Sequence, residues 1–306
     1  MEHIDLHSHT VYSDGTSTVE NSLTCAEALG LSVFSVTDHN TVGAYSEIIE
    51  KRSMFSGKIL PGVELSTVFE GEVIEILGYG IDVYAMDKLI KSNYLSFYDK
   101  QVKEARLDTL AVLEHGAVLD DWFVTAMLEH PESVFDPNRK SNREYLLAEM
   151  KRHPENARFF SSEEEFYSID RHRFSRDYLF NSKSTLYSDQ SSLSPSVDTV
   201  IRMIHDCGGL AFLAHAFVYS AEFPSKLSRV ADLGLDGMEC FYGTFTPAQK
   251  EYMSSFCEKR GIYKSGGSDF HGLDMRPMNL MGFSAGERID ISLVSEWISL
   301  FNDRFI

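Results

Sequence analysis

His3-Ile-Asp-Leu-His7-Ser-His9-Thr-Val-Tyr-Ser-Asp14-Gly15 is the stretch that decides the fold of this chain. A short run of β-forming residues, Ile4 to Leu6, leads into two histidines in an H-x-H pattern. Because side chains alternate along a strand, these two imidazoles point the same way and form a ready pair of ligands for one metal ion. An isolated H-x-H is explained equally well by surface or core histidines, so the rest of the chain must decide.

The composition is typical of a soluble globular protein. The chain has 306 residues, 43% hydrophobic and 24% charged, which is enough for one large α/β domain or two smaller ones. Four cysteines lie far apart without a C-x-x-C pair, so we expect reduced thiols and a cytoplasmic location. We see no signal-peptide pattern and no apolar run of about 18 residues, and therefore expect no membrane partner.

The formal net charge of -18 limits the partners. Nucleic acid and anionic membrane surfaces would be repelled, so no stable nucleic-acid complex is expected. The same carboxylates can hold divalent cations, which reverse the local field. An acidic protein can therefore still take a small anionic substrate. Nothing in the sequence indicates the oligomeric state.

Strands alternate with helices in both outer thirds of the chain, which predicts βα units and a mostly parallel sheet. The predicted strands are 4–6, 33–37, 58–60, 73–78, 210–214, 236–242 and 262–265. Ser17-Thr18-Val19-Glu20 has the form of a capping box and predicts the start of the first helix.

The middle of the chain lacks this alternation. One long amphipathic helix is expected from Met86 to His115, and further helices near 120–129 and 142–152. We therefore predict a barrel domain, residues 1–85 and 196–306, that is interrupted by a helical insertion, residues 86–195, acting as a cap over the substrate.

Side chains that can bind metals follow most of the predicted strands. They are His7, His9, Asp14, His39, Glu64, His215, Asp269 and His271. The carboxyl ends of parallel strands in a barrel meet on one face, where active sites are built. Any one of these histidines is more often structural, but unrelated structural histidines have no reason to gather at strand ends beside carboxylates. The set therefore predicts a metal centre.

The number of donors sets the number of ions. One catalytic zinc ion needs about three protein ligands, so this set predicts two or three divalent ions. Imidazole and carboxylate donors fit Mn, Fe or Zn without selecting among them. Ions a few Å apart lower the pKa of a shared water and clamp both oxygens of a phosphoryl displacement. The expected chemistry is hydrolysis of a phosphate ester by a metal-activated hydroxide.

As an ordered set, the motifs resemble those of the PHP (polymerase and histidinol phosphatase) superfamily. They are His7-Ser-His9-Thr10, Ser13-Asp14-Gly15, Thr37-Asp38-His39, Gly62-Val63-Glu64, Leu213-Ala214-His215 and Gly267-Ser268-Asp269-Phe270-His271-Gly272. Within it the chain is most similar to stand-alone phosphoesterases that act on nucleotides. The resemblance implies an α/β fold, a distorted seven-stranded (β/α)7 TIM-like barrel with a helical insertion.

The resemblance also implies a place for each ligand. One ion would be held by His7, His9 and Asp269. Glu64 would bridge to a second ion, and His215 would serve that second ion.

Asp14, His39 and His271 would complete the coordination, and the implied catalytic residues are Asp14, His39 and His215. Where the family usually has a histidine in the fourth strand, this chain has Glu75. We expect Glu75 to be a ligand as well; the alternative is a solvent-facing residue of an edge strand.

The cap departs from the family pattern. Its usual Gly-Arg-Pro-His stretch is not present, and Ser141–Tyr145 stands in its place. Two basic groups lie in the cap, Arg139-Lys140 with Arg143, and Arg171, Arg173 and Arg176 beside His172. The guanidinium fork suits phosphate oxygens, so we expect Arg143, Arg171, Arg173 and Arg176 to contact the substrate. A solvated charged face is the alternative.

The resulting hypothesis is a metal-dependent phosphoric ester hydrolase that acts on a nucleotide-like monoester or diester. Candidates are a nucleoside 3',5'-bisphosphate, a cyclic phosphate or a short oligonucleotide. A histidinol-phosphate phosphatase, or another small-molecule phosphatase, shares the superfamily and stays open. An amidohydrolase fits Asp14-Gly15 and Asp269-Phe270-His271 poorly, and a non-enzymatic metal-binding module is disfavoured by the nearly complete ligand set.

Overall fold

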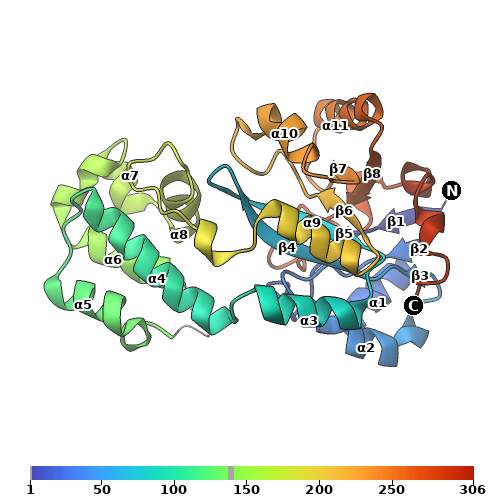
Figure 1. The fold of residues 1–306 in the computed structure, drawn as a ribbon, viewed down its shortest axis with the longest axis horizontal. Helices are drawn as coiled ribbons and strands as arrows, with labels where there is room; N and C mark the ends of the chain where they lie inside the picture. Colours follow the sequence, from blue (N-terminus) through green and yellow to red (C-terminus); the bar gives the residue numbers. More distant parts are fainter. Residues whose placement is uncertain (1, 137–140) are drawn as a thin grey trace. The chain divides into compact units, whose positions relative to one another are not determined.

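The computed structural model describes residues 2–136 and 141–306, which form two compact units (Figure 1). The sheet unit comprises Met1–Thr67, Ile74–Ser92 and Ser196–Ile306. The helical unit comprises Val68–Val73 and Asn93–Pro195. Within the described ranges, no helix is both long enough and apolar enough to cross a membrane.

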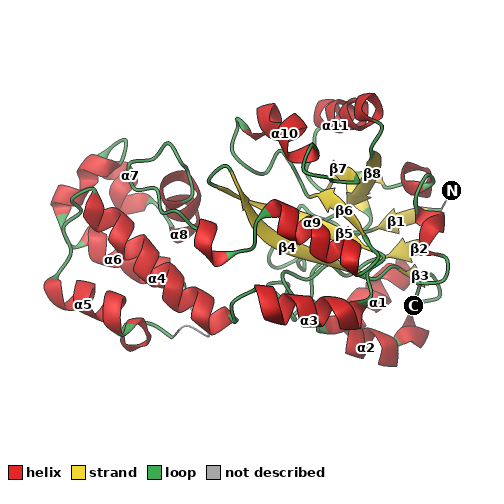
Figure 2. Ribbon diagram, in the orientation of Figure 1, coloured by secondary structure: helices red, strands yellow, loops and turns green. Residues whose placement is uncertain are grey.

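Two sheets organise the sheet unit, and Figure 2 shows their strands. The first is parallel and has the order β1-β2-β3, with bounds His3–Asp5, Leu31–Phe34 and Lys58–Ile59. The second has the order β4-β5-β6-β7-β8, with bounds Gly62–Phe69, Glu72–Tyr79, Leu210–Leu213, Gly237–Tyr242 and Tyr263–Gly267. A short antiparallel pair, β9 (Phe283–Ser284) with β10 (Glu287–Arg288), follows.

The expected α/β fold is present, but the described strands do not form one closed sheet. Isolated bridges join the two sheets instead: Ser8 pairs with Phe270, and His39 pairs with Glu64. The predicted parallel pairing is present in β1-β2-β3 and in β6-β7-β8, and β5 departs from it by pairing antiparallel with β6. β5 follows β4 through the two residues Glu70-Gly71, both at positive φ (50° and 78°), and a loop this short reverses the chain direction.

Strand β4 was not expected as a separate strand. It begins at Gly62, directly after Pro61, and continues for eight residues. Glu64 is therefore the third residue of this strand and does not follow the end of an earlier one. The two strands are hard to tell apart in the sequence because Leu60 and Pro61 alone separate β3 from β4.

Helices flank the strands of the sheet unit. They are α1 (Val19–Ala28), α2 (Ala44–Glu50), α3 (Val83–Asn93), α9 (Val197–Asp206), α10 (Leu227–Ala231) and α11 (Pro247–Arg260). The cap of α1 is Thr18, whose hydroxyl accepts from the Asn21 amide, and not Ser17 as predicted. Thr18 has the extended backbone that a cap requires, which leaves Ser17 outside the helix.

Aromatic side chains fill the core beneath the strands. Trp297 is fully buried, stacks on Tyr79 at 5.5 Å between ring centroids, and donates its indole N–H to the Lys264 carbonyl. Phe212 of β6 packs against both rings. A closely packed core of this kind holds the strands in fixed positions, and with them the predicted ligands that the strands and the loops after them carry.

The helical unit has its own core. Its helices are α4 (Phe97–Glu114), α5 (Asp121–Glu129), α6 (Asn142–Lys151), α7 (Glu163–Ser168) and α8 (Arg171–Phe174). The single helix predicted from Met86 to His115 is wrong, because α3 ends at Asn93 and α4 begins at Phe97. Ser96 caps α4 by accepting from the Asp99 amide, and such a capping side chain separates two helices.

Candidate metal centre

Histidine and carboxylate side chains of the sheet unit converge in three overlapping groups. Within each group the candidate ligand atoms lie within 4.8 Å of one another. The groups are His7-His9-Glu64-Asp269, His9-Asp14-His39-His271 and His39-Glu64-Glu75. His215, the ninth predicted ligand, joins them through Glu64 Oε1 at 3.0 Å and Glu75 Oε2 at 3.3 Å from its Nε2.

Backbone geometry at the strand ends brings these side chains together. The His9 amide donates to the Phe270 carbonyl and the Asp269 amide donates to the His7 carbonyl, both at 2.8 Å. His215 and Asp269 have positive φ, 23° and 56°, which is costly for residues with a Cβ. Such backbone strain is found where a site requires it, and here it turns two predicted ligands towards the others.

Glu64 lies at the centre of the arrangement. Its buried Oε2 is 3.1–3.3 Å from three imidazole nitrogens, His7 Nε2, His9 Nε2 and His39 Nδ1, yet it has no hydrogen-bond partner among the described residues. Three buried imidazole nitrogens of the predicted ligands also lack a hydrogen-bond partner among the described residues: His39 Nδ1, His215 Nδ1 and His271 Nε2. Buried polar atoms are normally paired, so this donor set fits divalent cations better than it fits a hydrogen-bond network.

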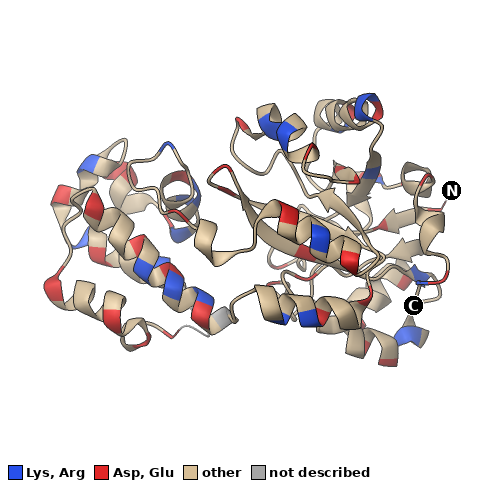
Figure 3. Ribbon diagram, viewed as in Figure 1, with Lys and Arg blue, Asp and Glu red and all other residues tan. Residues whose placement is uncertain are grey.

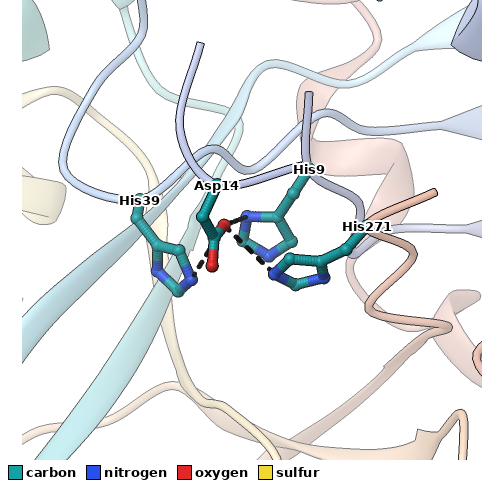
Figure 4. A group of neighbouring side chains, drawn as sticks. All are labelled: His9, Asp14, His39 and His271. Carbon is teal, nitrogen blue, oxygen red and sulfur yellow. Dashed lines mark ion pairs between the residues drawn. The ribbon is translucent and has the colours of Figure 1, made fainter. Parts of the chain in front are cut away.

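The second group forms around Asp14 (Figure 4). Its Oδ1 is 3.1 Å from His271 Nε2, 3.6 Å from His39 Nε2 and 3.9 Å from His9 Nδ1. The Asp14 side chain is 43% exposed, whereas those of His9 and His271 are fully buried. Asp14 is therefore the most exposed of the nine predicted ligands.

Carboxylates and imidazoles shift each other's pKa strongly. Burial opposes the charged form of His7, but Glu64, Glu239 and Asp269 outweigh it and raise the His7 pKa well above its usual value. Burial also opposes the charged form of His9, but the neighbouring carboxylates of Asp269 and Glu64 outweigh it and raise the His9 pKa to about 9. Because imidazole must be neutral to bind a metal, cation binding would release protons from this cluster.

Glu75 faces the cluster. Its Oε1 is 3.3 Å from His39 Nδ1 and its Oε2 is 3.3 Å from His215 Nε2, with the side chain 22% exposed. This orientation supports a ligand role and disfavours the alternative of a solvent-facing residue.

Replacing Glu75 by alanine is expected to lower metal content without removing it. The His39-Glu64-Glu75 group loses a donor, whereas the His7-His9-Glu64-Asp269 group stays complete. Elemental analysis after dialysis against a fixed free Mn²⁺ concentration measures this. The control is Glu258→Ala on α11, where the side chain is 63% exposed. Equal metal content in both variants would contradict a ligand role for Glu75.

Three buried carboxylates that we did not predict hold the predicted ligands in place. Glu239 Oε1 is 3.0 Å from His7 Nδ1, and its Oε2 accepts from the His215 amide at 2.8 Å. Asp5 accepts from the His7 and Ser268 amides. Glu239 lies inside β7, and Asp5 is the last residue of β1, two positions before the first histidine of the H-x-H pair.

The third carboxylate, Asp38, fixes the loop that carries Asp14. Its Oδ1 accepts from the Thr10 amide at 2.7 Å and from the Ser13 hydroxyl at 2.6 Å. Asp38 belongs to the predicted Thr37-Asp38-His39 motif, in which we singled out the histidine alone. The aspartate holds the His9–Asp14 loop beside His39.

Arg143 lies in the core of the helical unit. Its side chain is 10% exposed, Nε is 2.9 Å from Asp108 Oδ2, and Nη2 is 3.3 Å from Glu104 Oε2. The guanidinium also lies 4.5 Å from the Phe180 ring centroid. These contacts favour a structural role over the predicted contact with substrate, because the guanidinium is already held by two carboxylates.

Replacing Arg143 by alanine is expected to lower the free energy of unfolding by about 3–5 kcal/mol, the usual cost of leaving a buried charge without its partner. Denaturant unfolding followed by circular dichroism measures this. The control is Arg176→Ala, whose side chain is 69% exposed and whose loss should cost within about 0.5 kcal/mol. Similar unfolding curves for both variants would contradict the structural role.

The other predicted substrate-binding arginines lie on the surface of the helical unit, where charges of both signs mix (Figure 3). Arg173 pairs with Glu165 at 2.8 Å, Arg176 pairs with Asp177 at 2.6 Å, and Arg171 contacts His172 at 2.9 Å. Their contact with substrate stays a prediction. Arg139 and Lys140 lie outside the described residues.

A fourth group of possible metal ligands, Asp120, Glu149 and His153, lies in the helical unit. Here Arg152 pairs with Asp120 at 2.9 Å and with Glu149 at 3.2 Å. Ion pairs account for this group without a cation.

Comparisons with known proteins are consistent with this geometry. Residues 5–128 match the family model described as the PHP domain. The 5'-3' exoribonuclease Rnm of Salmonella typhimurium is 28% identical, covering 87% of this chain and 84% of the relative. The 3',5'-nucleoside bisphosphate phosphatase of Chromobacterium violaceum is 24% identical, covering 89% of this chain and 88% of the relative.

A solved structure supports the fold. A protein described as an amidohydrolase from Chromobacterium violaceum, with bound sulfate, aligns with a TM-score of 0.64 at 22% identity, covering 99% of this chain and 97% of its own. At this level of identity the likeness concerns the fold alone.

Proposed function

Because this chain carries a PHP domain and so belongs to the superfamily that its motifs indicated, we propose that it is a metal-dependent phosphoesterase acting on nucleotide-like substrates. The observation that carries the proposal is Glu64 Oε2, which is buried among three imidazole nitrogens without a hydrogen bond. The names of the relatives supply the substrate class, since one acts on RNA ends and another on nucleoside bisphosphates.

The three donor groups would hold two or three ions of Mn, Fe or Zn. Such ions supply a water of lowered pKa and stabilise charge on the phosphoryl oxygens. The roles that we propose for the individual residues differ with the exposure of their side chains. Asp14 and His39, 43% and 21% exposed, would be ligands that solvent and substrate can reach. His215, 6% exposed, orients Glu64 and Glu75.

The charge of the chain bears on the size of the substrate. Binding of a long nucleic acid depends on many contacts between basic side chains and phosphates, and a net charge of -18 offers few. Hydrolysis at one end of a substrate requires only that the terminal phosphate enter the centre. We therefore propose short substrates or single 5' ends, and no tight complex along a strand.

A phosphate-release panel on Mn²⁺-loaded protein tests the proposal. It compares a nucleoside 3',5'-bisphosphate, a cyclic nucleotide, a 5'-phosphorylated oligoribonucleotide, a sugar phosphate and histidinol phosphate. We expect the highest kcat/KM on one of the first three. Preference for histidinol phosphate would favour the small-molecule phosphatase alternative, and no turnover of any compound would contradict the proposal.

We also propose that the two sheets are the parts of one distorted seven-stranded (β/α)7 barrel, supported by the Ser8–Phe270 and His39–Glu64 bridges. The insertion, residues 86–195, would act as a cap that selects the substrate. This part of the chain has a hydrophobic core of its own, which supports an insertion whose residues can differ without changing the metal centre.

A further inference from the structure

The two carboxylate oxygens of Asp269 have different surroundings. Oδ1 faces the imidazoles, at 3.1 Å from His9 Nε2 and 3.3 Å from His271 Nδ1. Oδ2 accepts from the Tyr242 hydroxyl at 2.8 Å and pairs with Arg276 Nη1. The buried carboxylate of Asp269 therefore connects the metal centre to the guanidinium of Arg276, a residue that the sequence prediction did not include.

A short turn fixes Arg276 next to the centre. The Arg276 amide donates to the Gly272 carbonyl at 3.1 Å, one residue after His271. Gly272 has φ 98°, and a Cβ there would lie 2.0 Å from the Thr16 hydroxyl oxygen, so the turn requires glycine. The loop consequently returns to Asp269 in a defined position.

The guanidinium retains donors for a ligand. It has five N–H groups, and among the described residues its ion pair with Asp269 engages Nη1 alone. The Arg276 side chain is 38% exposed, in contrast to 1% for Asp269. Burial opposes its charged form, but Asp269, Tyr242, Asp14 and Glu64 raise its pKa, which places a permanent positive charge beside the predicted ligands.

We propose that Arg276 binds the phosphoryl group of the substrate, with Nη1 kept on Asp269 Oδ2 and the remaining N–H groups donating to a non-bridging oxygen. This role rests on the proposed function. A phosphate that enters a centre lined by four carboxylates (Asp14, Glu64, Glu75 and Asp269) meets repulsion, and a fixed guanidinium offsets it. The planar fork also matches phosphate oxygens better than a lysine ammonium would.

The alternative is that Arg276 only orients Asp269, and Tyr242 provides the matched control. Arg276→Gln and Tyr242→Phe each remove one partner of Asp269 Oδ2, but only Arg276→Gln also removes the positive charge of a guanidinium. Metal content is measured by elemental analysis, and the Kd of inorganic phosphate for the Mn²⁺-loaded proteins by calorimetry.

For Arg276→Gln we expect phosphate binding roughly 10–100-fold weaker, as for the loss of a charge-assisted hydrogen bond, with metal content within about twofold of that of Tyr242→Phe. Tyr242→Phe should change phosphate affinity by less than about threefold, and Arg276→Lys should recover part of the affinity. KM should rise in Arg276→Gln by a similar factor.

Equal phosphate affinity in Arg276→Gln and Tyr242→Phe, at saturating Mn²⁺, would overturn the proposal. Its failure is distinguishable from that of the proposed function. If wild-type protein hydrolyses the panel and Arg276→Gln binds phosphate normally, the role of Arg276 alone is wrong. If wild-type protein binds phosphate through Arg276 but hydrolyses nothing, the proposed function is wrong.

Discussion

Replacing His9 or Asp269 by alanine is expected to remove metal and to lower kcat/KM by at least about 1,000-fold. His9 belongs to two of the three donor groups, and Asp269 Oδ1 faces His7 and His9 from the other end of the sequence. Bound ions contribute several kcal/mol of transition-state stabilisation, and each 1.4 kcal/mol is a factor of ten in rate.

The fold should survive both substitutions, because the core around Trp297 does not depend on these residues. Circular dichroism and elemental analysis, run beside the assay, separate loss of metal from unfolding. The control histidine is His205 on α9, 41% exposed and paired with Asp236 at 2.7 Å. His205→Ala should keep its metal and its activity. Full activity in His9→Ala or Asp269→Ala would show that the shared centre is wrong.

Replacing Glu239 by glutamine is expected to weaken metal binding by about 10–100-fold, the usual effect of removing an outer partner of a ligand histidine. Glu239 accepts from His7 Nδ1, which leaves His7 Nε2 facing Glu64 and Asp269. It also accepts from the backbone amide of His215, the residue with φ 23°. Glutamine has the same size but carries no charge to hold the Nδ1 proton.

Titration of metal-free protein with Mn²⁺ gives the affinity, and excess Mn²⁺ should restore most of the activity. Such rescue is not expected for His9→Ala, which lacks the ligand itself. Glu258→Gln serves as the control for an exposed glutamate. If Glu239→Gln bound Mn²⁺ as tightly as the wild type, the buried glutamate would have a role in packing alone.

The convergence of the candidate ligand side chains could be predicted because paired donors near strand ends are visible in the sequence. His7 and His9 differ by two positions, and Asp269 and His271 do likewise, so each pair can be recognised without knowing what it faces. Which donors share a group did not follow from this spacing, and the expectation that Glu64 joins His7, His9 and Asp269 came from the family resemblance. In the structure the grouping depends on the Ser8–Phe270 and His39–Glu64 bridges.

Glu239, Tyr242 and Arg276 were missed for different reasons. Glu239 lies inside the apolar run Gly237-Met-Glu-Cys-Phe. A lone carboxylate in a buried strand needs a partner, and from this we could have predicted a role at the site. Tyr242 and Arg276 occur in no recognisable spacing relative to Asp269. Their roles appear only once the turn at Gly272 is known.

The errors in the fold had readable causes as well. The alternating run Val63-Glu-Leu-Ser-Thr-Val-Phe69, followed by Glu70-Gly71, is typical of the first strand of a hairpin. Ser96 with Asp99 has the spacing of a helix start within what we took for one helix. In both places local turn chemistry, and not hydrophobic periodicity, decided the structure.

The backbone bonds between His7, His9, Asp269 and Phe270 have a consequence for biosynthesis. His9 and Asp269 are 260 positions apart, so at about 5–20 residues per second the ribosome needs on the order of 10–50 s to make the second after the first. During that interval the H-x-H pair exists without its carboxylate partner. Contacts of such long range also slow folding. The nascent chain should therefore remain unable to retain its ions tightly until β8 has paired beside β1, which makes metal acquisition a late event in maturation.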